Sequence, residues 1–212
     1  FTVFEAGLLG LKCHLVDNLD KIGGQCIELY PEKPIYDIPG VPNQTGKEHI
    51  DSLLKQMEPF DYEVHLNQRV DKIEESGDYW IAETTDGISF KTLNIFIAAG
   101  AGSFEPRKPP VESPDKFLGK GIDYAVRSVD KYKDKDIVIF GGGDSALDWS
   151  VELANKAKSI KLVHRRDDFR GAEHTENKMR NFVASGEIEL KIPFVIKSIV
   201  GDKSFEGVEI MN

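Results

Sequence analysis

Three consecutive glycines, Gly141 to Gly143, separate an apolar run from a helical pattern, and this junction constrains the fold more than any other feature of the chain. Residues 137–140 predict a buried strand, and residues 144–157 predict a helix. The next strand is predicted at residues 159–164, with the sequence SIKLVH. A strand, a glycine turn, a helix and a second strand form a β-α-β unit, so the sequence predicts an α/β fold containing parallel strands.

The glycine turn fits the G-x-G-x-x-A pattern of dinucleotide-binding folds through Gly141, Gly143 and Ala146. Gly141 would permit the tight turn, Gly143 would let a pyrophosphate approach the backbone, and Ala146 would let the helix pack closely on the strand. The first residues of the helix, Asp144 and Ser145, carry free N–H groups at its positive end, which favours an anion there. We therefore predict that Gly141, Gly143, Asp144 and Ser145 bind a dinucleotide.

A basic cluster follows the second strand, at the position where an NAD-binding unit carries an acid. The stretch HRRDDFR provides four candidate ligands: His164, Arg165, Arg166 and Arg170. Guanidinium groups bind a dianionic phosphate through charge-assisted hydrogen bonds, whereas a bare ribose favours a carboxylate partner. The cluster therefore predicts specificity for the 2′-phosphate of NADP(H). Arg170 is expected about one helical turn beyond Arg166. The alternative is a solvated basic helix start that the two aspartates of the stretch balance.

The beginning of the chain has the pattern of the second half of another such unit. FTVFEAGLLG predicts a buried helix that ends at Gly10, and residues 12–16 predict a short strand that closes on Asp17. An acid in that position binds ribose hydroxyls, although Asp17 could equally cap an exposed strand end. The first strand and its glycine loop would lie upstream, so we expect the chain to be a fragment or an internal stretch of a longer protein.

The middle of the chain predicts a second group of elements. These are a loop at 23–40, a helix at 47–60 that Pro59 stops, strands at 63–66, 68–76, 79–86 and 88–100 with a hairpin turn at Asp86-Gly87, and a proline-rich connector at 101–114. Composition changes from apolar to Pro, Lys and Ser near residue 104. This change predicts two domains, 1–103 and 104–212.

Composition excludes several classes of protein. The net charge of -9 and the pI near 5.1 argue against nucleic-acid binding, because the average field repels phosphate backbones. No apolar run approaches the roughly 18 residues of a membrane span, and no secretory signal is evident. The two cysteines, Cys13 and Cys26, give neither a disulfide framework nor a zinc pattern. We therefore predict a cytoplasmic protein.

Several motifs together carry a family resemblance: the two nucleotide-binding halves, GGQC at 23–26 followed by YPEK and IYDIPG, IFIAAG at 95–100, and HRRDDFR. The chain resembles the two-domain flavoprotein NAD(P)H reductases of the thioredoxin reductase type. Within that group it is most similar to the ferredoxin/flavodoxin-NADP reductases of the thioredoxin reductase-like class, over essentially all of its length. The resemblance implies two Rossmann-like, three-layer domains, with the FAD domain incomplete at both ends, and FAD and NADP as cofactors.

The resemblance also implies roles for individual residues. Asp17 would bind the FAD ribose, and Gln25 and Tyr30 would lie against the isoalloxazine, with Tyr30 stacked on one ring face. Val70 would contact the adenine through its backbone, and Phe104 would lie along the flavin at the connection between the domains. From the residues alone, Tyr30 could equally be a packing aromatic and Val70 a core strand residue.

Disulfide-reducing relatives use paired cysteines, which this chain lacks. Five residues after Cys26 stands Pro31, where the lipoamide dehydrogenase type has its second cysteine. Residues 124–127, Tyr-Ala-Val-Arg, stand where thioredoxin reductases have C-x-x-C. We interpret Cys26 as a small buried residue beside the cofactor and not as a nucleophile, so electrons would leave the flavin directly.

The resemblance implies an NADPH-dependent flavoprotein oxidoreductase that passes a hydride from NADPH to FAD and single electrons to ferredoxin or flavodoxin, as a homodimer. No side chain need act as a catalytic acid or base, and no metal is expected. Three alternatives stay open: a flavin monooxygenase or NADPH oxidase that reacts with oxygen, a thioredoxin reductase-like enzyme with another acceptor, and a nucleotide-binding fragment without turnover.

Overall fold

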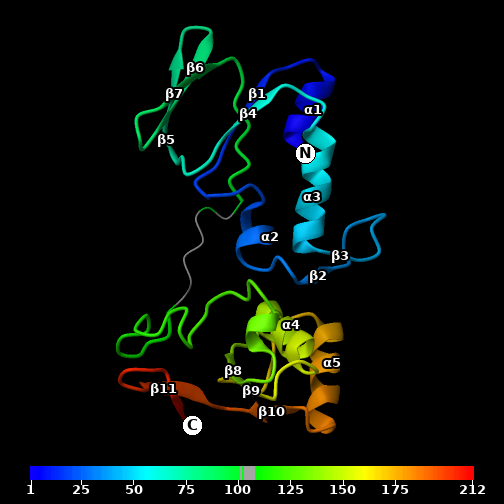
Figure 1. The fold of residues 1–212 in the computed structure, drawn as a ribbon, viewed down its shortest axis with the longest axis vertical. Coiled ribbons are helices and arrows are strands. Elements are labelled where there is room, and N and C mark those ends of the chain that lie inside the picture. Colours follow the sequence, from blue (N-terminus) through cyan, green and yellow to red (C-terminus); the bar gives the residue numbers. More distant parts are fainter. Residues whose placement is uncertain (101, 103–107) are drawn as a thin grey trace. The chain divides into compact units, whose positions relative to one another are not determined.

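The computed structural model describes residues 1–100, 102 and 108–212. The chain divides into two compact units, Phe1–Glu105 and Pro106–Asn212 (Figure 1). Phe104 and the predicted domain boundary beside it lie outside the described residues. In the part of the chain that the structure describes, no helix combines the length and apolar character that a membrane crossing requires.

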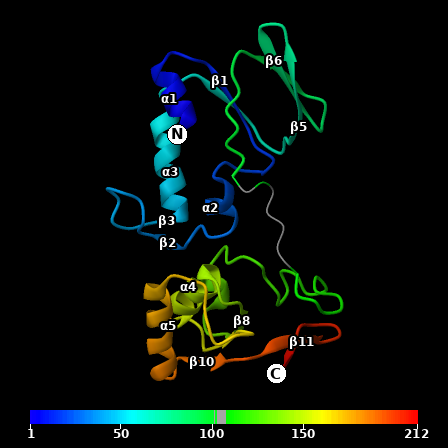
Figure 2. The same ribbon diagram turned by 180° about the vertical axis from the view of Figure 1, so that it is seen from behind.

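The first unit contains three helices and three small groups of strands among its described residues. The helices are α1 (Thr2–Leu8), α2 (Gly24–Glu28) and α3 (Gly46–Met57), and the strands are β1 (Cys13–Val16), β2 (Pro34–Ile35), β3 (Gln44–Thr45), β4 (Tyr62–His65), β5 (Val70–Ser76), β6 (Tyr79–Thr84) and β7 (Ser89–Thr92). Strands β1 and β4 pair in parallel, whereas β2–β3 and β5-β6-β7 are antiparallel. Seen from behind, α1 and α3 lie together on one side of the unit and the β5-β6-β7 sheet on the other (Figure 2).

Helix α1 ends where the sequence predicts. Gly10 has a φ of 72°, and its N–H donates to the carbonyl of Gly7 at 2.9 Å, while the N–H of Leu11 donates to Ala6 at 3.0 Å. This pair of bonds is a Schellman motif, which only a residue tolerant of left-handed backbone completes without strain. The chain then turns into β1.

Helix α3 begins with a capping box. The Thr45 hydroxyl accepts from the N–H of Glu48 at 3.2 Å, and the Glu48 carboxylate accepts from the N–H of Thr45 at 2.7 Å. These bonds lower the pKa of Glu48. The apolar face buries Ile50 and Met57, and the helix ends at Met57, two residues before the predicted stop at Pro59. The predicted helix is confirmed.

Two expectations about the first unit were wrong. The predicted loop at 23–40 contains the short helix α2 and the strand β2. The predicted strand at 88–100 stops at Thr92, and no described strand pairs with the residues that follow. Phe96 and Ile97 are 70% and 79% exposed. An apolar run becomes a strand only where a neighbour completes its hydrogen bonds, and periodicity does not reveal that neighbour.

The second unit has one parallel sheet. Its described elements are the single 3-10 turn η1 (Asp130–Tyr132), the helices α4 (Asp144–Leu153) and α5 (Glu173–Ala184), and the strands β8 (Asp136–Phe140), β9 (Ser159–Val163), β10 (Ile188–Lys191), β11 (Val195–Val200) and β12 (Gly207–Met211). The sheet order is β10-β9-β8, and β11 pairs with β12 as a separate hairpin. The predicted β-α-β unit is confirmed as β8-α4-β9.

The core of the second unit lies between its sheet and the helices α4 and α5, which also contact each other. Its most deeply buried side chains come from α4, β9, α5 and β10: Leu147, Ser150, Leu153, Ile160, Leu162, Val163, Met179 and Ile188. The only polar member, Ser150, donates its hydroxyl hydrogen to the carbonyl of Ala146 at 2.6 Å. The α4 N-terminus and the end of β9 are therefore attached to a well-packed body.

Replacing Thr45 by alanine should lower the stability of α3. The capping box loses its side-chain acceptor, which typically costs about 1 kcal/mol of unfolding free energy. Amide hydrogen exchange along α3 would measure the change. Thr85→Ala, in the exposed turn between β6 and β7, is the control and should leave α3 exchange unaltered. Equal exchange in both variants would contradict the role given to Thr45.

Candidate functional site

The glycine turn leaves the carboxyl end of β8 and leads directly into α4. Gly141 has a φ of +150°, and a Cβ built on it would lie 2.8 Å from the Cβ of Ala146. Its N–H donates to the carbonyl of Val163 at 3.1 Å, which continues the pairing of β8 with β9. The close approach of the turn to the helix is the one that the sequence pattern predicts for Gly141 and Ala146.

Gly143 caps the N-terminus of α4 and faces open space. Its φ of -103° suits any residue, and a Cβ built on it would meet no atom within 4 Å. The two residues that follow, Asp144 and Ser145, are exposed in the first turn of the helix. An accessible backbone at a helix N-terminus fits a pyrophosphate, because the free N–H groups and the helix dipole both favour an anion there.

His164, a predicted cofactor ligand, is buried against the glycine turn. A Cβ on Gly142 would lie 2.3 Å from Cε1 and Nε2 of the imidazole, so only glycine fits beneath the ring. The ring is 8% exposed, stacks on Phe169 with centroids 5.1 Å apart, and has Nε2 3.2 Å from the carbonyl oxygen of Asp168. The structure thus gives His164 a packing contact with the turn.

The residues after β9, here called the basic segment (residues 164–172), fold over the glycine turn. The Arg170 N–H donates to the carbonyl of Gly142 at 2.7 Å, and the Ala172 N–H donates to a carboxylate oxygen of Asp144 at 2.8 Å. A Cβ on Gly171 would lie 2.6 Å from Cδ1 of Leu147. The segment is irregular and α5 begins only at Glu173, so these residues are not the helix start of the alternative interpretation.

Three arginines remain exposed on the basic segment: Arg165, Arg166 and Arg170. Among the residues that the structure describes, no carboxylate lies within ion-pair distance of any of the three. The two aspartates of the segment, which the alternative interpretation takes as their counter-charges, make no ion pair with them. The three guanidinium groups are therefore exposed and, among the described residues, make no direct ion pair.

In the first unit, Asp17 directly follows β1, at the carboxyl end where the sequence places it. Its N–H donates to the carbonyl of His65 at 3.0 Å, and its carboxylate accepts from the N–H of Leu19 at 3.0 Å. That second bond is local side-chain capping, as the alternative interpretation expects. The half-buried position at the end of a parallel strand also suits a ribose. Both interpretations of Asp17 stay open.

Cys26, within α2, packs against Tyr30, which follows the helix. The Cys26 thiol lies 3.8 Å from the Tyr30 hydroxyl, and burial, helped by this contact, raises the pKa of Tyr30 to about 12. A Cβ on Gly46 would lie only 2.7 Å from the Tyr30 carbonyl oxygen, so the start of α3 packs on this turn. Gln25 is half-buried within α2. Cys26 is thus a half-buried packing partner of Tyr30.

The other two FAD candidates are Val70 and Phe104. Val70 is the first residue of β5, opposite Thr84, and is 38% exposed. It is therefore not the core strand residue of the alternative interpretation. Phe104 is outside the described residues.

Sequence patterns missed the residues that hold the basic segment in place. Gly142 was assigned no role, because the fingerprint leaves that position free, and Asp144 was predicted only as a nucleotide contact. Gly171 was not considered. An Asp in the first turn is common in helices. That Asp144 accepts a hydrogen bond from Ala172, 28 residues further along the chain, cannot be inferred from the local sequence.

Gly142→Ala should destabilise the second unit. The new Cβ must displace the His164 ring, and overpacking of this kind costs about 1–3 kcal/mol. Gly143→Ala is the matched control and should change stability by less than about 1 kcal/mol, because its Cβ meets no atom. Denaturant titration followed by the fluorescence of Trp149, buried in α4, measures both. Equal stability of the two variants would contradict the packing role of His164.

Comparisons with known proteins identify the family. A family model described as pyridine nucleotide-disulphide oxidoreductase matches residues 30–204. A ferredoxin--NADP reductase from Bradyrhizobium sp. (strain BTAi1) is 54% identical over 193 residues, which are 91% of this chain and 56% of the relative. Another, from Pelagibacter ubique, is 45% identical over 210 residues, 99% of this chain and 62% of the relative. The chain thus spans about 56–62% of the length of these curated relatives.

Solved structures give the same result for the fold. Lactococcus lactis thioredoxin reductase superposes with a TM-score of 0.79 at 26% identity, covering 99% of this chain and 68% of that structure. Thioredoxin reductase from T. acidophilum has a TM-score of 0.81 at 18% identity, covering 98% and 64%, which shows the fold alone. The predicted α/β Rossmann-type fold and the predicted resemblance to ferredoxin-NADP reductases are confirmed. The chain belongs to the pyridine nucleotide-disulphide oxidoreductase family.

Proposed function

We propose that the chain is the nucleotide-binding part of an NADPH-dependent flavoprotein reductase of the ferredoxin-NADP reductase type. When bound, NADP and FAD supply the chemistry: a hydride passes from NADPH to the flavin, and single electrons pass on to ferredoxin or flavodoxin. One observation carries the proposal. The exposed arginines of the basic segment lie beside an open helix N-terminus and lack carboxylate partners among the described residues.

The chain's own residues would divide the binding of NADPH between them. The backbone at Gly143 and the first turn of α4, with Asp144 and Ser145, would hold the pyrophosphate. Arg165 and Arg166 would bind the 2′-phosphate through charge-assisted hydrogen bonds. The Arg170 N–H donates to the Gly142 carbonyl, and the Asp144 carboxylate accepts from the Ala172 N–H. These two bonds hold the basic segment on the glycine turn, so Arg170 and Asp144 also position the other guanidinium groups.

The first unit would hold FAD. We assign Asp17 to the ribose, Gln25 and Tyr30 to the isoalloxazine, Val70 to the adenine and Phe104 to the flavin edge, with residues 1–103 as the FAD part and 104–212 as the NADP part. Support comes from the half-buried Asp17 at the carboxyl end of β1, where parallel sheets bind nucleotides. The raised pKa of Tyr30 keeps the phenol neutral, so its ring can lie against an aromatic system without a charge.

The acceptor would be a one-electron carrier and not a disulfide. Both cysteines, Cys13 and Cys26, are free thiols, and they stand on separate elements. No cysteine occurs after Cys26 in the sequence, so the second unit has no thiol for a disulfide relay. We also propose a cytoplasmic homodimer: the free thiols suit a reducing compartment, and the dimer rests on the family resemblance.

Replacing Arg165 and Arg166 together by alanine should weaken NADP⁺ binding at least about tenfold and leave NAD⁺ binding unaltered. A lost charge-assisted bond to the 2′-phosphate is worth about 1.5 kcal/mol or more, whereas NAD⁺ lacks that phosphate. Calorimetric titration with each nucleotide measures both affinities. Lys133→Ala with Lys135→Ala removes the same charge from another exposed site of the unit and is the control. Unchanged NADP⁺ preference would refute the assignment.

Gly143→Ala separates the pyrophosphate contact from the 2′-phosphate contact. Its Cβ enters the open space at the α4 N-terminus, so NADP⁺ and NAD⁺ affinities should fall together, by at least about tenfold, while the unit stays folded. The same titrations measure this. If only NADP⁺ binding fell, the pyrophosphate would have to lie elsewhere.

Turnover of the full reading frame distinguishes the proposed reductase from the oxygen-reactive flavoproteins. NADPH oxidation should depend on added ferredoxin or flavodoxin and consume little oxygen. Stopped-flow absorbance and an oxygen electrode follow the two processes. Oxygen uptake in proportion to NADPH, stimulated by an organic substrate, would favour a monooxygenase, and absence of any turnover would favour a binding module.

A further inference from the structure

Three potential metal ligands meet on one face of the β1–β4 pair, far along the chain from the basic segment. In the parallel register His14 lies opposite Glu63, and Val16 lies opposite His65. Because side chains alternate along a strand, His14, Glu63 and His65 share a face. One ligand atom from each lies within 4.8 Å of the other two. The separation of His14 Nδ1 from His65 Nε2 is 2.9 Å, and from Glu63 Oε2 it is 3.9 Å.

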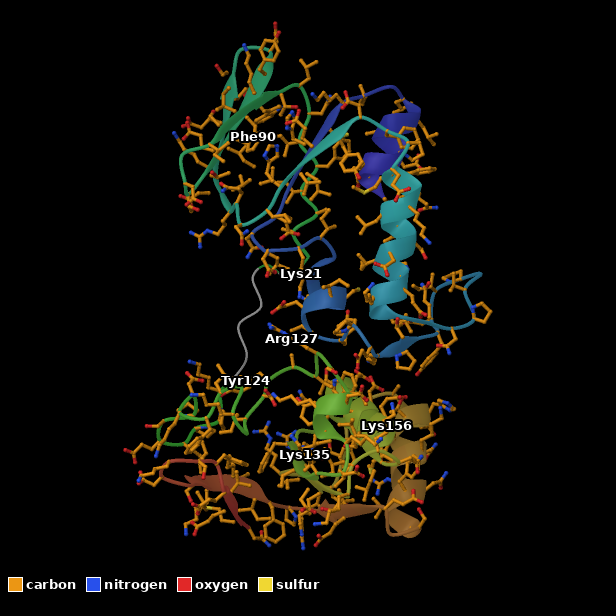
Figure 3. All side chains as sticks on the ribbon, viewed as in Figure 1. Lys21, Phe90, Tyr124, Arg127, Lys135 and Lys156 are labelled. Atoms are coloured by element: carbon orange, nitrogen blue, oxygen red, sulfur yellow. The ribbon has the colours of Figure 1, made fainter. Side chains whose placement is uncertain are left out.

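The surroundings of the cluster hold the two imidazoles in place. The two ring planes are nearly parallel, with an interplanar angle of 23° and centroids 5.2 Å apart. Phe90 of β7, which Figure 3 labels, packs against both, with its ring centroid 4.8 Å from that of His65 and 5.6 Å from that of His14. The contact with Phe90 limits the rotamers of both imidazoles, so the two ring nitrogens are held close together without an ion.

The third potential ligand, Glu63, forms an ion pair with Lys12. Lys12 lies two residues before His14 on the same face, and its ammonium is 2.8 Å from Glu63 Oε1. This hydrogen bond and the lysine charge lower the pKa of Glu63. The oxygen nearer to His14 is the other one, Oε2. Lys12 is thus a competitor of a cation for the same carboxylate.

We propose that His14, Glu63 and His65 form a binding site for a divalent transition-metal ion of the zinc class. Two ring nitrogens at hydrogen-bond distance require a proton between them, and an ion can replace that proton by accepting both lone pairs. Metal–nitrogen bonds of about 2.0–2.1 Å in tetrahedral geometry place two nitrogens about 3.3 Å apart, so the rings need to separate by about 0.4 Å and to turn until both lone pairs point at the ion. A remaining position is left for water.

The donor set selects the ion. Two imidazoles and one carboxylate suit Zn²⁺ and neighbouring transition metals, whereas Mg²⁺ and Ca²⁺ favour oxygen ligands throughout. The ion would join β1 to β4 just before Asp17, whose N–H already donates to the carbonyl of His65. Binding to the folded state alone raises stability. This inference does not rest on the proposed function, since no nucleotide-binding residue is among the ligands.

Titration of the metal-stripped protein with Zn²⁺ tests the site. We expect a 1:1 calorimetric transition, a higher melting temperature, and d–d absorption bands of tetrahedral intensity when Co²⁺ is used instead. His14→Gln and His65→Gln should each weaken Zn²⁺ binding at least about tenfold, since even the loss of an outer partner of a metal ligand costs 10–100-fold. Glu63→Gln, which preserves shape, should weaken it as well and covers the case in which a histidine variant fails to fold.

Two control variants make the result specific. His174→Gln removes an exposed histidine from α5 and should leave Zn²⁺ affinity unaltered. Lys12→Gln should tighten binding, because the ammonium no longer competes for Glu63. Equal affinity of the unmodified protein, His14→Gln and Glu63→Gln would overturn the proposal and leave a hydrogen-bonded histidine pair. Weaker binding in His174→Gln would do the same, by placing the ion elsewhere.

Discussion

The contact between the Gly142 backbone and the His164 ring is the constraint on which the candidate NADPH site depends. Because β8 and β9 are parallel and in register, with Phe140 opposite Val163, the residues that follow the two strands emerge side by side. A side chain on Gly142 would occupy the space of the imidazole. The absence of that side chain lets the basic segment lie directly on the glycine turn, and the hydrogen bond from Arg170 to the carbonyl of Gly142 closes the arrangement.

This packing gives neighbouring basic residues of the stretch HRRDDFR different environments. His164 is buried and fixes the path of the chain. Arg165 and Arg166 are exposed, and neither makes an ion pair with a described carboxylate. This arrangement would favour phosphate binding, because charged donors held by a rigid backbone lose less conformational freedom on binding than donors on a loose loop. The Asp144 carboxylate accepts a hydrogen bond from the Ala172 N–H and forms no ion pair with the neighbouring guanidinium groups.

In the first unit, too, the pairing of parallel strands brings candidate binding residues together. Parallel pairing of β1 with β4 brings His14 and His65 together across 51 residues, and it also places Asp17 at a common strand end. The nearby turn around Tyr30 is held by a glycine, since α3 starts against its carbonyl oxygen. In both units a backbone approach that permits no Cβ supports the candidate binding residues.

The sequence by itself determined the β-α-β unit around Gly141, the end of the first helix at Gly10 and the charge reversal at Arg165, because periodicity, glycine conformation and side-chain charge are local properties. It predicted a strand to residue 100, whereas β7 ends at Thr92, because apolar character does not report whether a neighbouring strand is present to complete the hydrogen bonds. Tertiary structure alone decided that His164 is buried beside exposed arginines, that Asp144 binds the backbone of Ala172, and that two histidines meet on one sheet face. Those outcomes depend on strand register and on which groups compete for the same space, and neither is encoded within a short window of residues.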